Sequence, residues 1–263
     1  PMYVATLLQA VPTDIAVWYT AHHLPRRNAD TPFWVLMFSL TSWFNAYSSV
    51  RTFANGQETM ALAVAVALCC PELFSQKRWN GKISWRFYLA FFLGGLSAAV
   101  RFSAVAAFVP LGIILALKRD SVLDKLSFLF NPCAFFGLAG LTAVAVVDRI
   151  FYGFWTIPAL GNLHFNAVLD NAKLYGAHPF LWYFTSGVPA ILGPLVLFLL
   201  FSASKSKSQV LPLWTIWLVF VVVMSFNDHK EFRYIHPILP LVCLICGSSM
   251  PLFREGLGRV RNS

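Results

Sequence analysis

The densest group of polar residues in the sequence lies between two apolar segments, from Asn227 to His236. It contains two acids, two histidines and the cations Lys230 and Arg233, which share one face if the segment is helical. His229 adds a further hydrogen-bond donor. Cations and donors at this spacing are suited to bind a phosphate group. The alternative is a solvated turn with internal ion pairs.

Arg101 is a charge between two apolar stretches, residues 86–100 and 103–117. A charged side chain at the centre of a bilayer costs roughly 2.5–3.5 kcal/mol on insertion scales. We therefore expect Arg101 to have a partner or a polar cavity, unless it only marks the interfacial turn of a helical hairpin.

Arg51, Asn55 and Glu58 form a third polar group, at a spacing that places them on adjacent turns of one helix face. A local salt bridge between Arg51 and Glu58 explains the same pattern equally well.

A long connection from Asp148 to about Ser186 is rich in aromatic residues. A loop of this length is uncommon without a function. Its rings suit anchoring at a membrane interface, which accounts for most of them, and stacking on the faces of sugars for a minority.

The elements that must position these groups are membrane helices. Hydrophobic residues make up 58% of the chain and charged residues 12%, against about 25% charged in an average soluble domain. A bilayer span needs about 20 mostly apolar residues, and an open sheet edge cannot face lipid. We predict an all-α polytopic membrane protein with one transmembrane domain over residues 1–263. The nine predicted segments are 1–20, 32–50, 59–75, 86–100, 103–117, 128–148, 187–202, 209–226 and 237–252.

The distribution of positive charge predicts which loops share a side of the membrane. Nine crossings place the loops near residues 26, 80, 120, 205 and 257 together with 14 of the 20 Lys and Arg residues, so this side is predicted to face the cytosol. The predicted luminal loops are those near 51–58, 101, 148–186 and 227–236. The six basic residues on that side are Arg51, Arg101, Arg149, Lys173, Lys230 and Arg233.

Several other functions are disfavoured by the sequence. The basic residues are dispersed among short loops, which argues against nucleic-acid binding. The five cysteines lie in or beside apolar runs, so a disulfide framework is not expected. Because the sequence supplies no acidic cluster, we expect no metal ion and no other cofactor.

These motifs resemble those of the dolichyl-phosphate-mannose-dependent mannosyltransferases of glycosyltransferase family 22. The run His229–Tyr234 resembles the family's HKE-x-R element, and residues 51–58 are similar to its R-T-x-x-N-x-x-E loop. Arg101 is similar to the arginine of the family's Arg-Pro-Thr, with Phe102 and Ser103 as departures. Among members, the run Tyr175–Phe184 is most similar to those that add the third mannose in GPI-anchor assembly.

The resemblance implies a multispanning GT-C fold in the endoplasmic reticulum membrane. The implied reaction is transfer of mannose from dolichyl-phosphate mannose to a GPI precursor glycolipid on the luminal face. The residues implied to bind the donor phosphate are His229, Lys230, Arg233 and Arg101. Those implied to support them or to contact substrate are Arg51, Asn55, Glu58, Asp148, His178, Tyr183 and Glu231.

The catalytic base of the family is expected to be an Asp in an acidic pair of the first luminal loop, and no residue after Pro1 matches it. Pro1 falls within an apolar segment that is already under way. We therefore expect an N-terminally truncated chain whose base lies upstream of Pro1.

Three alternatives to this function stay open at this point, one of them a non-catalytic assembly subunit, which a true N-terminus near Pro1 would favour. An N-glycan mannosyltransferase of the same family has a similar element near Tyr175 but a different continuation. A lipid or solute transporter would use the same cations to line a path, although no inverted internal repeat is evident.

Overall fold

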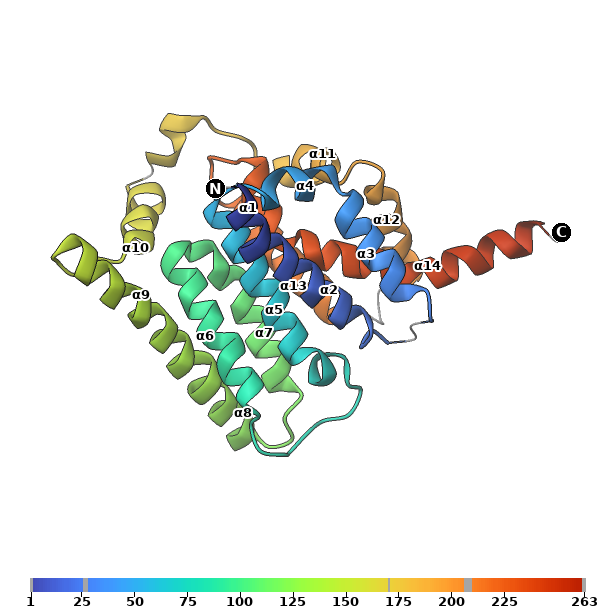
Figure 1. Ribbon diagram of the computed structural model, residues 1–263, viewed down its shortest axis with the longest axis horizontal. Helices are drawn as coiled ribbons and strands as arrows, with labels where there is room; N and C mark the ends of the chain where they lie inside the picture. The colour runs from blue at the N-terminus through green and yellow to red at the C-terminus, as the bar shows by residue number, and fades with distance from the viewer. Residues whose placement is uncertain (1, 26–27, 170, 206–209, 262–263) are drawn as a thin grey trace.

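The computed structural model describes residues 2–25, 28–169, 171–205 and 210–261, and these fold almost wholly into helices (Figure 1). The all-helical prediction is confirmed for this part of the chain. The predicted loop positions Arg26, Arg27 and Lys207 lie outside the described residues.

The helices follow one another with short connections. Those of the first half are α1 (Met2–Ala5), η1 (Thr6–Ala10), α2 (Val11–Ala21), α3 (Thr31–Thr41), α4 (Trp43–Ser49), α5 (Ala54–Phe74), α6 (Trp85–Val100), η2 (Phe102–Ala104), α7 (Val105–Leu117) and α8 (Val122–Phe128). Those of the second half are η3 (Leu129–Phe135), α9 (Phe136–Tyr152), α10 (Pro158–Leu163), η4 (His164–Val168), η5 (Asn171–Tyr175), η6 (Tyr183–Gly187), α11 (Val188–Leu192), α12 (Leu195–Lys205), α13 (Leu211–Ser225), η7 (Phe232–Ile238) and α14 (Leu239–Arg261).

Prolines account for several irregular helical turns. The π-helical turns η1, η3 and η6 lie just before or around Pro12, Pro132 and Pro189. Proline has no backbone N–H, so a carbonyl in the preceding turn loses its usual donor and the helix locally widens. Near Pro12 the hydroxyl of Thr13 donates to the carbonyl of Gln9 at 2.6 Å.

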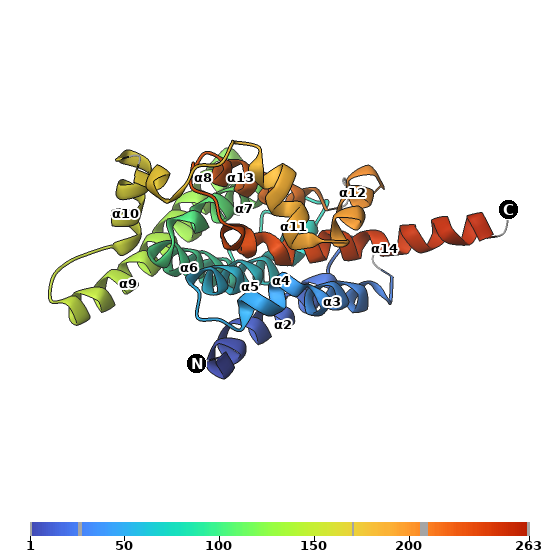
Figure 2. The ribbon, with the colours of Figure 1, turned by 90° about the horizontal axis from the view of Figure 1, so that it is seen from above.

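The helices α5 and α14 lie in the core, whereas α8, η3 and α9 form one long outer helix. Only 11% of the most apolar window of residues 122–152 is buried within the protein. Figure 2 shows α9 and the end of α14 extending to opposite sides of the molecule. A helix that is apolar on its exposed side is expected where lipid, rather than water, surrounds it.

The outer helix packs on α6 through glycines at the contact. A Cβ atom added at Gly95 would stand 1.8 Å from the carbonyl oxygen of Gly137, and one at Gly140 would stand 2.2 Å from that of Phe92. The two backbones therefore approach as closely as residues without side chains permit, as is common between membrane helices.

The predicted count of nine spans is not confirmed. Among the described residues three helices are long and apolar enough to cross a membrane, Ala54–Phe74, Val122–Tyr152 and Phe232–Glu255, and a bent pair, Tyr183–Leu192 with Leu195–Ser204, makes up to four. Helices occupy the other predicted ranges but are shorter, because breaks such as that at Ser42 between α3 and α4 interrupt them.

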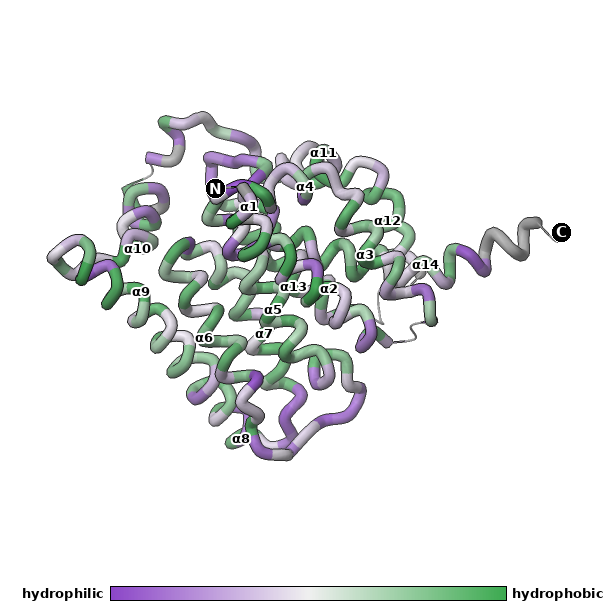
Figure 3. The backbone as a smooth tube through the Cα atoms, viewed as in Figure 1, coloured by the Kyte–Doolittle hydropathy of each residue, from purple (hydrophilic) through white to green (hydrophobic). Residues whose placement is uncertain are grey.

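The polar ends of the helices gather at two opposite regions. At one, Arg119 donates to the carbonyl oxygen of Gly81 at 2.8 Å and Arg86 pairs with Glu72 at 2.6 Å. Figure 1 shows this region at the bottom, where the connection from α5 to α6 lies near α8. Figure 3 shows hydrophilic stretches there and near the N label, with hydrophobic helices between them.

Candidate functional site

Three segments that are distant in sequence meet at the second polar region. These are the start of α5, the break between α6 and η2, and η7 with the turn before it. Proximity follows from packing, since η7 contacts α5, α4, α13 and α14. The region contains most of the candidate site residues identified in the sequence.

Arg101 and Glu58 form an ion pair at the break between α6 and η2. The Nε atom of Arg101 lies 3.3 Å from Oε2 of Glu58, whose side chain is only 2% exposed. The backbone of Arg101 is extended where it connects the two helices of a hairpin, and its side chain has a charged partner. The alternative pairing of Glu58 with Arg51 is wrong.

Arg51 lies outside the helix that contains Asn55 and Glu58, because α5 begins only at Ala54. Its Nε donates to the carbonyl of Tyr47 at 3.2 Å, and its guanidinium lies 3.9 Å from the ring centroid of the same residue. The expectation of three residues on one helix face therefore holds for Asn55 and Glu58, both buried, and fails for Arg51.

Glu231 is the centre of a second charged group. Its carboxylate accepts hydrogen bonds from His229 at 3.1 Å and Tyr234 at 3.0 Å, and pairs with Nε of Arg233 at 2.5 Å. Partial burial alone would raise the pKa of Glu231, but the hydrogen bonds from Arg233, His229 and Tyr234 outweigh it and lower the pKa below the ordinary 4.5. The carboxylate is thus held as an anion.

The ring of Tyr234 joins the two charged groups. The guanidinium carbon of Arg101 lies 5.0 Å from its centroid and that of Arg233 lies 5.9 Å away. Each arginine is held by its own carboxylate, Glu58 or Glu231. The side chains of Arg101 and Arg233 are 25% and 44% exposed, so both retain surface for a ligand.

Lys230 points away from this group and into the protein. Its ammonium donates to the carbonyl of Asn227 at 2.6 Å and to that of His178 at 3.0 Å, and the residue is 3% exposed. Burial lowers the pKa of Lys230 from its ordinary value, against the opposing charge of Asp228. The prediction that Lys230 binds phosphate stays a prediction.

The end of the long aromatic loop packs against the same turn. The ring of His178 stacks on that of Trp182, with centroids 4.7 Å apart. Tyr183 is fully buried and its hydroxyl donates to the carbonyl of Glu231 at 3.3 Å. Asp148 is not brought to the site. It lies near the end of α9, which diverges from the helix bundle (Figure 1).

A buried histidine beside the site was counted in the polar group of the sequence but was given no role there. His236 is 0% exposed; its Nδ1 lies 3.1 Å from the hydroxyl of Thr59, and its Nε2 lies 3.3 Å from Oδ1 of Asn45. Asn45 donates to Ser39, whose hydroxyl donates to Asp14 at 2.6 Å. Only its sequence position near Arg233 distinguished His236, so the network depended on helix packing that the sequence does not display.

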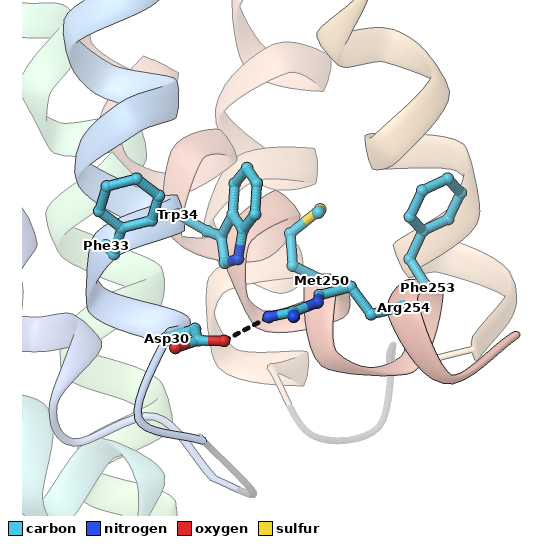
Figure 4. A pocket seen from close by; sticks show the side chains of 6 residues that line it. All are labelled: Asp30, Phe33, Trp34, Met250, Phe253 and Arg254. Atoms are coloured by element: carbon cyan, nitrogen blue, oxygen red, sulfur yellow. Dashed lines mark hydrogen bonds and ion pairs between the residues drawn. The ribbon is translucent and has the colours of Figure 1, made fainter. Parts of the chain in front are cut away.

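A cavity lies elsewhere, between α3 and α14. It has a volume of about 490 Å³ and is lined by Asp30, Phe33, Trp34, Met250, Phe253 and Arg254. Figure 4 shows Arg254 directed at Asp30, with which it forms an ion pair. Its residues belong to the predicted cytosolic side and share none of the charged contacts around Tyr234. Across the described residues, no group of three His, Cys, Asp or Glu is arranged to hold a metal ion.

Comparison with known proteins assigns the chain to a family. A model of the Alg9-like mannosyltransferase family matches residues 1–258. The chain belongs to this family. The family expectation drawn from the motifs at 51–58, 101 and 229–234 is therefore confirmed.

Similar members of the Alg9-like family carry GPI-related names. GPI alpha-1,2-mannosyltransferase 3 of Bos taurus and that of Homo sapiens are each 32% identical over 95% of this chain, which covers 44% and 43% of their lengths. GPI mannosyltransferase 3 of Yarrowia lipolytica is 30% identical over 87% of this chain and 42% of its own length. The chain spans less than half the length of these curated relatives. No solved structure matches it.

Proposed function

We propose that the protein transfers mannose from dolichyl-phosphate mannose to a GPI-anchor precursor, as the third mannose, on the luminal face of the endoplasmic reticulum membrane. Family membership and the names of the relatives support mannosyl transfer in GPI-anchor assembly. The structural observation that supports it most is the pair Arg101 and Arg233, which come from different segments and flank the ring of Tyr234.

Two guanidinium groups beside one ring are suited to a lipid-linked phosphate. Arginine donates parallel hydrogen bonds to phosphate oxygens, and cations lower the barrier where negative charge grows on a leaving phosphate. His229, which contacts the carboxylate of Glu231 on the same turn, is the third residue proposed to lie near the phosphate. The carboxylates of Glu58 and Glu231 orient the two arginines.

The proposed reaction is an inverting displacement. A carboxylate removes the proton of an acceptor mannose hydroxyl while dolichyl phosphate departs. The pKa of Glu231 is lowered by its hydrogen-bond partners, and a carboxylate stabilised as an anion accepts a proton weakly, so we do not assign the base to Glu231. Glu58 lies against Arg101 and is proposed to orient it. The acceptor is proposed to lie along the loop that contains His178 and Tyr183.

Complementation tests this function. The gene that encodes the chain, expressed in cells lacking the third GPI mannosyltransferase, should restore GPI-anchored proteins at the cell surface, measured by flow cytometry. Arg101→Ala at equal membrane abundance should restore far fewer. Rescue of an N-glycan mannosyltransferase defect, without rescue of surface GPI anchors, would preserve the family and overturn the acceptor.

A further inference from the structure

Lys230 lies in the middle of the charged turn yet makes only internal contacts in the described structure. Its ammonium donates to the carbonyls of Asn227 and His178, at 2.6 and 3.0 Å. The residue is 3% exposed. A buried ammonium requires such acceptors, because its desolvation is otherwise uncompensated.

The two carbonyls belong to different segments. Asn227 begins the charged turn, whereas His178 belongs to the long aromatic loop. The same two segments are joined by a backbone hydrogen bond, in which the amide of His178 donates to the carbonyl of Asp228 at 3.0 Å. Further along, the rings of Trp182 and Phe232 lie 5.0 Å apart. These contacts between residues 178–182 of the loop and residues 227–232 of the turn are called the seam below, and Lys230 lies at its start.

A phosphate cannot reach this ammonium without breaking the seam. An ammonium has three N–H donors, and two of them are used on the carbonyls of Asn227 and His178. Arg233 differs in both respects, because its side chain is 44% exposed and its partner is a carboxylate on the same turn. Lys230 and Arg233, the two cations of the sequence motif, therefore have different roles.

We propose that Lys230 is a positioning residue that fastens the loop around His178 to the turn that carries His229 and Arg233, and does not bind the donor phosphate. On the proposed function, the loop faces the acceptor and the turn faces the donor. The seam then sets the distance between the two substrates, and its loss weakens the binding of both. Arg233, by contrast, acts on the donor alone.

Hydrogen–deuterium exchange of the purified protein tests the seam without reference to activity. Lys230→Met should speed exchange at least tenfold in peptides covering residues 174–182. Without the ammonium, the loop is no longer held against the turn, and the hydrogen bond from the amide of His178 to the carbonyl of Asp228 opens more often. Exchange in α5 should stay unchanged, which establishes that the protein is folded. Lys230→Arg, which retains several donors, should restore most of the protection. Unchanged exchange around His178 in Lys230→Met would overturn the proposal.

Lys173→Met is the matched control. Lys173 also joins the loop to the turn, through an ion pair of 3.5 Å with Asp228, but its side chain is 55% exposed. An exposed ion pair contributes little, so exchange around His178 should stay within twofold of the unchanged protein. An effect as large as that of Lys230→Met would show that the exposed pair of Lys173 and Asp228 fastens the loop as strongly, and would overturn the specific role of Lys230.

Amine labelling of the unchanged protein supplies a second measurement, which needs no variant to fold. Mass spectrometry after acetylation should find Lys173 modified and Lys230 unmodified, with or without dolichyl phosphate. Modification of Lys230 that dolichyl phosphate prevents would identify a phosphate ligand and refute the seam.

Kinetics then connects the seam to the proposed reaction. Lys230→Met should raise the KM for acceptor and donor at least fivefold each with a smaller change in kcat, whereas Arg233→Ala should raise that for the donor only. Faster exchange around His178 with unchanged KM values would show that the seam does not set the position of the two substrates. Absence of any mannosyl transfer by the unchanged protein would instead reject the proposed function and leave the exchange result standing.

Discussion

Arg101 and Arg233, the two cations beside Tyr234, are each paired with a carboxylate. Glu58, in α5, pairs with Arg101, and Glu231, just before η7, pairs with Arg233. Paired arginines lose less rotamer freedom when a ligand arrives, because the guanidinium is already oriented. The arrangement therefore favours an anion that both arginines contact at once.

Replacing Arg233 should impair use of the lipid donor. Losing one charge-assisted hydrogen bond costs about 1.5–3 kcal/mol, so Arg233→Ala should raise the donor KM about tenfold or more. Lys173→Ala removes an equal charge from the exposed loop and should leave it nearly unchanged. Transfer assays on membranes with equal amounts of both variants make the comparison. Equal donor KM values would remove Arg233 from the phosphate site.

Replacing Glu58 should impair donor use. Glu58→Gln leaves the guanidinium of Arg101, whose side chain is 25% exposed, without the carboxylate that orients it. Glu72→Gln is the matched control, since Glu72 pairs with Arg86 at the opposite polar region and is 20% exposed. In transfer assays at equal membrane abundance only Glu58→Gln should raise the donor KM, and an equal rise in Glu72→Gln would contradict the assignment.

The Glu231 cluster should respond to acid with a defined sign. Its folded pKa lies below the ordinary 4.5, so its contribution to stability is present above about pH 4.5 and is lost as the pH falls through the folded value. We expect Glu231→Gln to lower unfolding free energy by about 1.5 kcal/mol at pH 7. The difference should shrink below pH 4.5. A His229→Gln background keeps the facing histidine from titrating, and a difference that grows with acid would contradict the cluster.

The sequence predicted the composition of the site better than its contacts. The charged turn at 227–236 stood out because its polar density exceeds what a connecting loop needs. The partner of Glu58 was not predictable, because nearby Arg51 has the same charge as distant Arg101 and only helix packing decides between them. The direction of Lys230 was equally hidden, because its two acceptors are backbone carbonyls, which every residue has.

At the scale of the elements, the sequence located the helices but not their breaks. Apolar runs predicted helices that the structure contains, since hydrophobicity sets where helices enter an apolar environment. Breaks depend on local detail. Ser42 interrupts one run by capping α4, with its side chain accepting from the amide of Asn45. Short helices joined by such breaks fall below the length of a complete span, which explains the lower count.

The contact of α6 with α9 should be the most sensitive to added volume. Gly95→Ala and Gly140→Ala each place a methyl group against a backbone carbonyl, and overpacking of this kind costs about 3 kcal/mol. Gly137→Ala is the control, because its new Cβ would meet only the carbonyl of Phe91 at 3.8 Å. Thermal unfolding should show a large loss for the first two and little for the third. Equal losses would mean that helix flexibility, not close contact, explains the glycines.

At the scale of the whole molecule, polar groups lie in two regions separated by hydrophobic helices. Loops near 80 and 120 meet at one region, and those near 51–58, 101 and 227–236 meet at the other. The sequence analysis grouped these loops in the same way, from the alternation of loops and the count of basic residues, and the side of the membrane that each group faces stays a prediction. The sequence did not predict that the loop from Asp148 begins far from the site, because the length of a loop does not show in which direction the helix before it runs.

Thiol labelling of intact vesicles checks this partition. Single cysteines at Thr52, Ala177 and Phe226, all exposed, should react from the same side with a membrane-impermeant reagent. Cysteines at Asn80 and Asp120, also exposed, should react only from the other. The background should replace Cys133, the one native cysteine that is not buried in the described structure. Mixed reactivity within either set would contradict the topology.

The ion pair of Glu58 and Arg101 also imposes an order on biosynthesis. The ribosome makes Glu58 before Arg101, so α5 enters the membrane with an uncompensated carboxylate and waits for the hairpin of α6 and α7 to deliver its counterion. A charged side chain in lipid is costly until it is paired. This ion pair therefore joins α5 to the hairpin of α6 and α7 only after Arg101 has been inserted.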